Sequence, residues 1–149
     1  MWPIISTVAR AGETYTYAPD ISEAEARTQW LPSPPWRTVV AVDPGGHVLG
    51  MAKLGPNHPG PGSHIANASF IVDPRVARQG VGRALAEHVL AVARADGYRA
   101  MQFNAVVETN TAAVALWRSL GFQVLTTVPE AFRHPTLGVV GLHVMHRAL

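Results

Sequence analysis

The most regular pattern of apolar residues in the chain begins at Val81. Leu85, Val89 and Val92 follow at intervals of three or four residues, which places them on one face of a helix. Gly97 comes just after this pattern and is a typical helix stop. The chain therefore predicts a long amphipathic helix over its middle third.

The same helical period, together with the period of two that is typical of strands, predicts the other elements. Strands are expected over Arg37–Val42, Val48–Leu54, Ile65–Val72, Ala100–Val107, Gln123–Val128 and Val139–Met145. Further helices are expected over Met1–Arg10, over Glu23–Trp30 behind a Ser22/Glu25 capping box, and from Thr109-Asn110-Thr111 to Leu120. Loops are expected at Gly55–Gly62 and between the last two strands, where Pro129 and Pro135 stand.

The order of these elements indicates the fold class. The expected order is two helices, a hairpin, a strand, a helix, a strand, a helix and two strands. This order indicates an α/β fold with a mixed sheet. A strand, helix and strand in succession predict one right-handed crossover at its centre. The 149 residues suit a single domain that spans residues 1–149.

Composition narrows the class of protein. The net charge is only +2 and the basic residues are scattered, which argues against nucleic acid as the main partner. No apolar run approaches the ~20 residues of a membrane helix, and no secretory signal is evident, so we expect no membrane partner and a cytoplasmic location. The chain has no cysteine and no histidine pair with ligand spacing on one helix, so no metal is expected.

The stretch Val72–Ala84 joins the strand to the long helix and carries the first candidate chemistry. Asp73-Pro74 stops the strand, and Gly80 and Gly82 open the helix. Without side chains at these two glycines, an anion can approach the first-turn amides, which lack intrahelical partners. Close packing of helix on sheet also explains two glycines, so both interpretations stay open at this point.

A second segment agrees with an anion-binding turn. It contains Asn110, Ala113, Leu116 and Trp117, and it ends in Leu120-Gly121-Phe122. Together the two segments resemble the cofactor-binding motifs of the GCN5-related N-acetyltransferase (GNAT) superfamily. The Glu-Thr-x-Thr pattern that starts at Glu13 is similar to the acceptor loop of its phosphinothricin-acetyltransferase-like branch.

The resemblance implies acetyl transfer from acetyl-CoA to an amine. It implies a mostly antiparallel sheet with helices on both faces, whose first strand is missing here because the chain begins almost directly in its first helix. The strands that start at Ile65 and Ala100 are expected to part where the pantetheine arm enters, and apolar C-terminal strands suggest a homodimer. The cofactor-binding residues implied are Ile71, Val72, Gln79, Gly80, Val81, Gly82, Arg83, Ala84, Asn110, Ala113 and Trp117.

Three departures from the family pattern bear on the mechanism. Ala77 stands where a Gln or Arg usually begins the pyrophosphate motif, which leaves recognition to backbone amides. The strand Ile65–Val72 contains no acid, so the base must come from elsewhere, and Glu108 and Glu13 are the candidates. Trp117 takes the place of a tyrosine that protonates the leaving thiolate in many members, and an indole cannot act as that acid.

Other polar residues are candidates for the acceptor side. Asn67 and Asn104 are predicted to orient a water or the substrate, and Tyr15, Tyr17 and His134 to line the acceptor pocket. Each candidate also has a plain structural explanation, because interior asparagines satisfy backbone groups and loop tyrosines pack. In the same way, the two candidate acids would otherwise be solvated, and Asn110 would be a helix cap.

Three functions follow from these motifs. The leading hypothesis is an N-acetyltransferase that moves acetyl from acetyl-CoA to a primary amine of a small molecule or amino-acid-like acceptor by direct attack. The second is a non-catalytic acyl-CoA-binding sensor or degenerate homologue, because the expected acid and tyrosine are missing. The third is another nucleotide-binding α/β protein, although the chain lacks both a P-loop and a full Gly-x-Gly-x-x-Gly.

Overall fold

A computed structural model describes residues 1–149, and it contains a six-stranded sheet in the order β1-β2-β3-β4-β6-β5. The helices are α1 (Trp2–Ala11), α2 (Glu23–Trp30), α3 (Val81–Ala95) and α4 (Thr111–Ser119), and two short 3-10 turns are η1 (Gly60–Gly62) and η2 (Pro74–Val76). The strands are β1 (Arg37–Val42), β2 (Val48–Pro56), β3 (Ile65–Val72), β4 (Ala100–Val107), β5 (Gln123–His134) and β6 (Gly138–Ala148). Only β3 and β4 pair in parallel, so the sheet is mixed and mostly antiparallel, as predicted.

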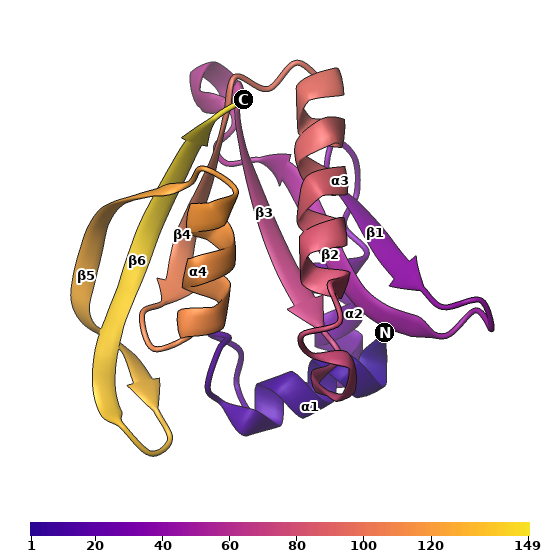
Figure 1. The fold of residues 1–149 in the computed structure, drawn as a ribbon, viewed down its shortest axis with the longest axis vertical. Helices are drawn as coiled ribbons and strands as arrows, with labels where there is room; N and C mark the ends of the chain where they lie inside the picture. Colours follow the sequence, from indigo (N-terminus) through magenta and orange to yellow (C-terminus); the bar gives the residue numbers. More distant parts are fainter.

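Helices cover both faces of the sheet, which confirms that part of the prediction (Figure 1). On one face, which we call the α3 face, α3 packs over β2 and β3, and its Leu85 and Val89 share one buried core with Trp117 of α4 and with Met101 and Phe103 of β4. The opposite face, which we call the α1 face, has its own core of six buried residues: Ile4, Ile5, Ala26, Trp30, Met51 and Ile71. Strand alternation assigns even-numbered residues of β3 to the α3 face and odd-numbered ones to the α1 face.

The local signals at the helix ends are confirmed. The Ser22 hydroxyl accepts the Glu25 amide hydrogen at 3.2 Å while the Glu25 carboxylate accepts the Ser22 amide hydrogen at 2.8 Å, so the capping box forms. Gly12 ends α1 in the left-handed conformation at φ 65°. As predicted, no strand precedes α1 in this chain. None of the helices is long and apolar enough to span a membrane.

The limits predicted for two loops were wrong. β2 continues through Gly55 to Pro56, because both residues still pair with β3. β5 runs through Pro129 to His134 and forms a hairpin with β6, where a loop was predicted. The register moves from Val128↔Leu142 to Phe132↔Val140, so Pro129 lies in a bulge, where its missing N–H costs no ladder hydrogen bond.

The parallel pair at the centre of the sheet is short. β3 and β4 are in register only at Ile65↔Ala100 and Ala66↔Met101, and beyond these pairs the two strands diverge (Figure 1). The predicted parting of these strands is therefore confirmed. Figure 1 also shows that the open end of this gap lies at the same end of the sheet as α1, the start of α3 and the β5–β6 turn.

Candidate functional site

The turn between β3 and α3 is held in shape by a buried carboxylate. Asp73 is 5% exposed, and its Oδ1 accepts the Arg75 amide hydrogen at 2.9 Å. Its Oδ2 accepts from Arg75 Nη2 at 2.6 Å, and the hydrogen bonds from Arg75 hold the pKa of Asp73 below its usual range. The Asp73 amide donates to Leu49 O of β2 at 2.8 Å, so the turn starts at a fixed point on the sheet.

The turn then presents unpaired amides to solvent. Arg78 and Gly80 both have positive φ, 64° and 84°, and the first helical hydrogen bond of this turn runs from Ala84 N to Gly80 O at 3.0 Å. The amides of Val81, Gly82 and Arg83 have no backbone acceptor. Unpaired amides at the positive end of a fifteen-residue helix are a general feature of anion sites. Of the predicted turn residues, Gln79 and Ala84 already donate their amide hydrogens to Val76 O and Gly80 O, so Val81, Gly82 and Arg83 keep amides that an anion could use.

Gly82 faces the space between β3 and α4. A Cβ atom at this position would lie 3.6 Å from both Leu116 Cδ2 of α4 and Val72 Cγ2 of β3, which are ordinary contact distances. A methyl group would therefore fit here in contact with both side chains, and the glycine leaves that space free beside the unpaired amides.

The Arg83 side chain connects the start of α3 to the end of α4. Its Nη2 donates to Ser119 Oγ at 2.7 Å, and its Nη1 lies 3.5 Å from Glu87 Oε1, the predicted i,i+4 partner. Ser119 in turn donates to Leu116 O at 2.7 Å. The start of α3 and the end of α4 are thus joined by a hydrogen bond close to the unpaired amides.

The amides of β3 that face the gap can be assigned from the β2 ladder. Asp73 and Leu49 form a hydrogen-bonded pair, so two residues earlier the Ile71 amide also points to β2. Ile71, predicted together with Val72 to bind the cofactor, therefore directs its amide to β2 and its side chain into the α1-face core, so it offers neither to the gap. The Val72 and Phe70 amides point the other way, toward the gap where β4 has departed.

Trp117 is the centre of an aromatic cluster beside this gap. Its ring centroid lies 4.8 Å from both Phe70 of β3 and Phe103 of β4, and 6.0 Å from Phe122. Phe103 and Phe122 stack at 4.4 Å. With 7% of its surface exposed, Trp117 packs against both diverging strands on the α3 face.

On the α1 face, two predicted acceptor-side tyrosines lie together. The Tyr15 and Tyr17 rings are 4.6 Å apart, and Tyr15 lies 6.4 Å from Trp30 of α2. Burial holds the pKa of Tyr15 well above its usual range, although the Ser69 hydroxyl and the Phe70 amide act in the opposite direction. Tyr15 is therefore a neutral phenol, and its hydroxyl reaches β3 where the gap begins.

The Tyr17 hydroxyl has a similar but weaker environment. Burial raises its pKa, and the nearby indole N–H of Trp30 offsets part of that rise. Trp30 Nε1 itself is buried and makes no hydrogen bond of ordinary geometry. The pair of tyrosines thus lies over an indole with unsatisfied hydrogen-bonding capacity.

A chain of amides crosses the same face. Gln102 Nε2 donates to Asn104 Oδ1 at 2.9 Å, and Asn104 Nδ2 donates to Asn57 Oδ1 at 2.7 Å. Asn104 lies at a bulge of β4, and Asn67 is half-buried on β3, opposite Gly55 of β2. Both predicted asparagines therefore belong to the polar surface beside Ser69, on the side away from α3.

Glu108 is fixed at the end of β4 by a backbone contact. Its Oε1 accepts the Gly141 amide hydrogen of β6 at 2.5 Å, and its own amide donates to Gly141 O at 3.1 Å. A Cβ on Gly141 would lie 2.6 Å from Thr127 Cγ2 and 2.9 Å from Glu108 Oε2, so a larger residue here would displace both side chains. Glu108 thus joins β4 to β6, whereas Glu13 is exposed in the turn after α1.

The remaining predicted residues also make structural contacts. Asn110 Oδ1 accepts the Ala113 amide hydrogen at 3.2 Å and caps α4, while Ala113 packs against the α3-face core. His134 ends β5, where its Nδ1 accepts the Thr136 and Leu137 amide hydrogens at 3.3 Å each. These contacts show how the two side chains are held. Cofactor binding by Asn110 and acceptor binding by His134 stay predictions. No group of three or more His, Asp or Glu side chains converges as a metal site would require.

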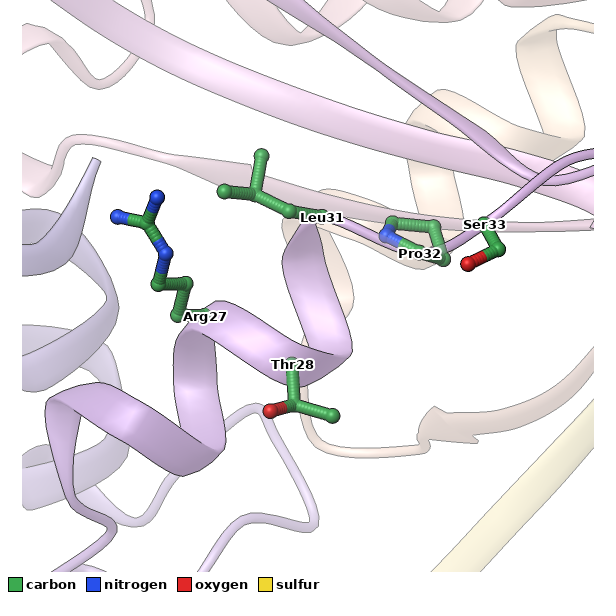
Figure 2. A pocket seen from close by; sticks show the side chains of 5 residues that line it. All are labelled: Arg27, Thr28, Leu31, Pro32 and Ser33. Carbon is green, nitrogen blue, oxygen red and sulfur yellow. The ribbon is translucent and has the colours of Figure 1, made fainter.

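Sequence reasoning missed the roles of Asp73, Ser69 and Trp30. The polar Ser69 in an apolar strand was a usable signal, but contacts between Trp30 and the tyrosines depend on how α2 packs. A shallow hollow at the end of α2 is lined by Arg27, Thr28, Leu31, Pro32 and Ser33 (Figure 2). Because it contains none of the residues described above, we do not count it as part of the site.

Replacing Asp73 tests the turn. Because the pKa of Asp73 is lowered in the folded state, its ionised form stabilises the protein above the unfolded pKa of ~3.9, and this stability is lost as pH falls through the folded pKa. Asp73→Asn should cost about 1 kcal/mol of unfolding free energy at pH 7 and almost nothing near pH 2. Denaturant titrations at both pH values measure the difference, and a pH-independent loss would contradict this account.

The fold and the turn described above define a class of protein, the acetyltransferases, and comparisons with known proteins agree. Residues 6–122 match the acetyltransferase (GNAT) family, so the chain belongs to that family and the predicted acyltransferase class is confirmed at the family level. A GCN5-related N-acetyltransferase from Kribbella flavida is 54% identical with a TM-score of 0.96, over 100% of this chain and 90% of that one.

More distant relatives were also found. A phosphinothricin acetyltransferase from Sinorhizobium meliloti in complex with AcCoA shares the fold at 22% identity and a TM-score of 0.87, over 99% of this chain and 80% of that one. The N-acetyltransferase aca1 of Schizosaccharomyces pombe is 37% identical over 86 residues, which is 58% of this chain and 41% of that protein. The chain therefore matches less than half the length of this curated relative.

Proposed function

We propose that the protein is an N-acetyltransferase that moves acetyl from acetyl-CoA to a primary amine of a small molecule or amino-acid-like acceptor by direct attack. The observation that carries this proposal is the gap between β3 and β4 beside the unpaired amides of α3. The unpaired amides of α3 suit the diphosphate of acetyl-CoA. The gap beside them, with its free strand amides, suits the linear, amide-containing arm that follows the diphosphate. Two structures that share the fold contain acetyl-CoA.

On the donor side, the chain supplies backbone groups. The Val81, Gly82 and Arg83 amides would hold the diphosphate, and the Phe70 and Val72 amides would hold the arm and the thioester oxygen. A fixed donor at a developing oxyanion contributes ~3–4 kcal/mol in comparable sites. Trp117 would border the arm as an apolar wall, and the leaving thiolate would take its proton from solvent or another residue.

On the acceptor side, the proposed residues lie on the α1 face. The amine would enter over Tyr15, Ser69 and the asparagines and reach the thioester through the gap between the strands. For an amine of pKa ~10.4, deprotonation at pH 7 costs roughly 4–5 kcal/mol, so a base is useful. Glu108 and Glu13 stay the proposed bases, with the Glu108 carboxylate already held by Gly141.

The decisive experiment is a binding and turnover assay. Calorimetry should detect acetyl-CoA binding, and a thiol reagent should detect CoA release with at least one amine from a panel. The panel should include phosphinothricin, free amino acids, and a peptide that begins with alanine, because a ribosomal-protein-alanine N-acetyltransferase from Brucella melitensis also shares the fold. Tight binding without turnover would favour the acyl-CoA sensor instead, and preference for ATP or NAD would favour an unrelated nucleotide site.

Tyr15→Phe tests the proposed acceptor side. Removing the hydroxyl deletes a neutral hydrogen-bonding group beside Tyr17 and Ser69 on the α1 face. We expect kcat/KM for the acceptor to fall about 10- to 100-fold while the Kd for acetyl-CoA stays within a factor of two. Tyr17→Phe is the matched control and should have a smaller effect, since Tyr17 contacts Trp30 rather than β3.

Two further predictions remain proposals. A homodimer is supported by exposed apolar side chains on the β5–β6 hairpin, where Leu125, Leu137 and Val139 are 58%, 60% and 51% exposed. The edge strand β5 has one free side, which a second copy of the hairpin would cover. A cytoplasmic location remains a prediction from the sequence.

A further inference from the structure

Side-chain amides occupy the α1 face at the point where β3 and β4 begin to part. Asn67 and Gln102 directly follow Ala66 and Met101, the last residue pair that joins the two strands. Both lie on the α1 face, because Ala66 and Met101 belong to the core of the opposite face. Neither strand contains a charged residue, so the inner end of the gap is bordered by neutral side chains alone.

A hydrogen-bonded chain holds these amides in one arrangement. The backbone amide of Asn57 donates to Ile65 O at 2.7 Å, which fixes Asn57 at the start of β3. Its Oδ1 accepts from Asn104 Nδ2 at 2.7 Å, and Asn104 Oδ1 accepts from Gln102 Nε2 at 2.9 Å. Asn57 Nδ2 and Gln102 Oε1 make no side-chain hydrogen bond within the protein, so the chain keeps a donor at one end and an acceptor at the other.

An indole ring borders the amides on the side of β2. Gly55 of β2 lies opposite Asn67, and a Cβ on Gly55 would lie 2.3 Å from Trp36 Cδ2 and 2.5 Å from its Cγ. The half-buried ring of Trp36 therefore lies directly against the β2 backbone. A flat apolar wall beside amide donors and acceptors suits a small ligand that carries neutral polar groups.

The flanking strands β2 and β6 add two ionisable side chains on this face. The Lys53 ammonium donates to Gln29 O of α2 at 3.0 Å, and His146 of β6 lies opposite Gln102. Neither is a carboxylate, so an acceptor with a second ammonium group would find no negative partner on these four strands at this face.

The direction of the gap connects this surface to the proposed reaction. The unpaired amides of α3 lie at the open end of the gap (Figure 1). From Val72 back to Asn67, β3 covers about 16 Å at ~3.3 Å per residue, a length similar to that of an extended pantetheine arm. An arm that enters at the open end would thus bring its thioester close to Asn67 and Gln102.

We propose that the acceptor is an amine with a neutral, amide-bearing body, such as an amino acid amide, and that Asn57, Asn104 and Gln102 hold this body beside Trp36. This inference deepens the proposed function and rests on it for the position of the amine. A neutral amide exchanges its hydrogen bonds with water for bonds to the side-chain amides. A carboxylate or an ammonium group loses hydration on strands that carry no opposite charge.

Binding of acetylated products tests this inference, and the ionisation of the amine does not affect it. N-acetylalaninamide and N-acetylalanine differ only in carrying an amide or a carboxylate. With excess CoA present, calorimetry should give a Kd for N-acetylalaninamide at least about tenfold below that for N-acetylalanine.

Asn104→Asp tests whether the amide chain is responsible. The variant keeps an oxygen for Gln102, but it removes the donor to Asn57 and adds a negative charge. Binding of N-acetylalaninamide should weaken about tenfold, while an unchanged Kd for CoA shows that the variant is folded. Gln123→Glu is the matched control, because it makes the same change of charge at an exposed residue of β5, and it should leave both Kd values unchanged.

The outcomes separate this inference from the proposed function. Equal or tighter binding of N-acetylalanine, or no binding of either compound, would overturn it, and turnover of an amine in the same preparation would leave the proposed function intact. Equal losses in Asn104→Asp and Gln123→Glu would also overturn it. If no amine is acetylated but N-acetylalaninamide is preferred and this preference is lost in Asn104→Asp, the proposed function fails and the assignment of the amide surface stands.

Discussion

Gly82→Glu should reduce acetyl-CoA affinity by at least about 100-fold while leaving the protein folded. The Cβ of the new side chain would lie 3.6 Å from Leu116 Cδ2 and Val72 Cγ2, and the rest of the side chain would extend from the first turn of α3 beside the unpaired amides. Its carboxylate would compete for the free amides and repel a diphosphate, and a loss of ~2.7 kcal/mol in binding corresponds to this factor.

The same substitution should not lower the free energy of unfolding. Glycine is unfavourable inside a helix by ~1 kcal/mol relative to alanine, and an acidic residue in the first turn interacts favourably with the helix dipole. Thermal unfolding of Gly82→Glu is therefore expected at or above the wild-type temperature. Gly82→Gln is the matched control for bulk, and it should lose less affinity because it adds no charge.

Calorimetric titration with acetyl-CoA measures the affinity of all three proteins. Wild-type affinity in Gly82→Glu would show that the ligand does not use these amides, and the proposed donor site would then be wrong. Equal losses in the Glu and Gln variants would show that the side chain blocks the site sterically and that charge is unimportant. Unfolding at a lower temperature would mean that the turn itself was damaged.

Trp117→Ala should have the largest effect on stability. The ring contacts Phe70, Phe103 and Phe122, and it is 7% exposed, so removing it leaves a large cavity between the diverging strands. Such truncations cost ~3–5 kcal/mol, which for a protein of this size lowers the Tm by roughly 6–20 °C.

Trp117→Phe provides the control for this prediction. A phenyl ring retains much of the contact with Phe70 and Phe103 and should cost only ~1–2 kcal/mol. Differential scanning calorimetry compares the three proteins. A Tm for Trp117→Ala within about 2 °C of the wild type would mean that the cluster is not a central support of the α3 face.

The fold class and most elements could be predicted from the sequence because their signals are local. The spacing of Leu85 and Val89, the capping pair at Ser22 and the alternation in β3 depend on neighbours within a few residues. The limits of β5 could not be predicted in this way. Pro129 usually ends a strand, but a bulge against β6 gives it a position without a ladder hydrogen bond, and only strand pairing decides that.

The sequence by itself determined the turn at Gly80 and Gly82. Glycine allows the positive φ that the turn needs, and the start of a helical pattern just after it leaves the first amides of the helix unpaired. The structure alone decided which strand amides accompany them. Ile71 and Val72 are adjacent in the chain and were predicted together, yet the ladder with β2 turns one amide away from the gap and the other toward it. The contact of Tyr15 with Trp30 of α2 likewise depends on packing between distant segments, which local sequence patterns do not record.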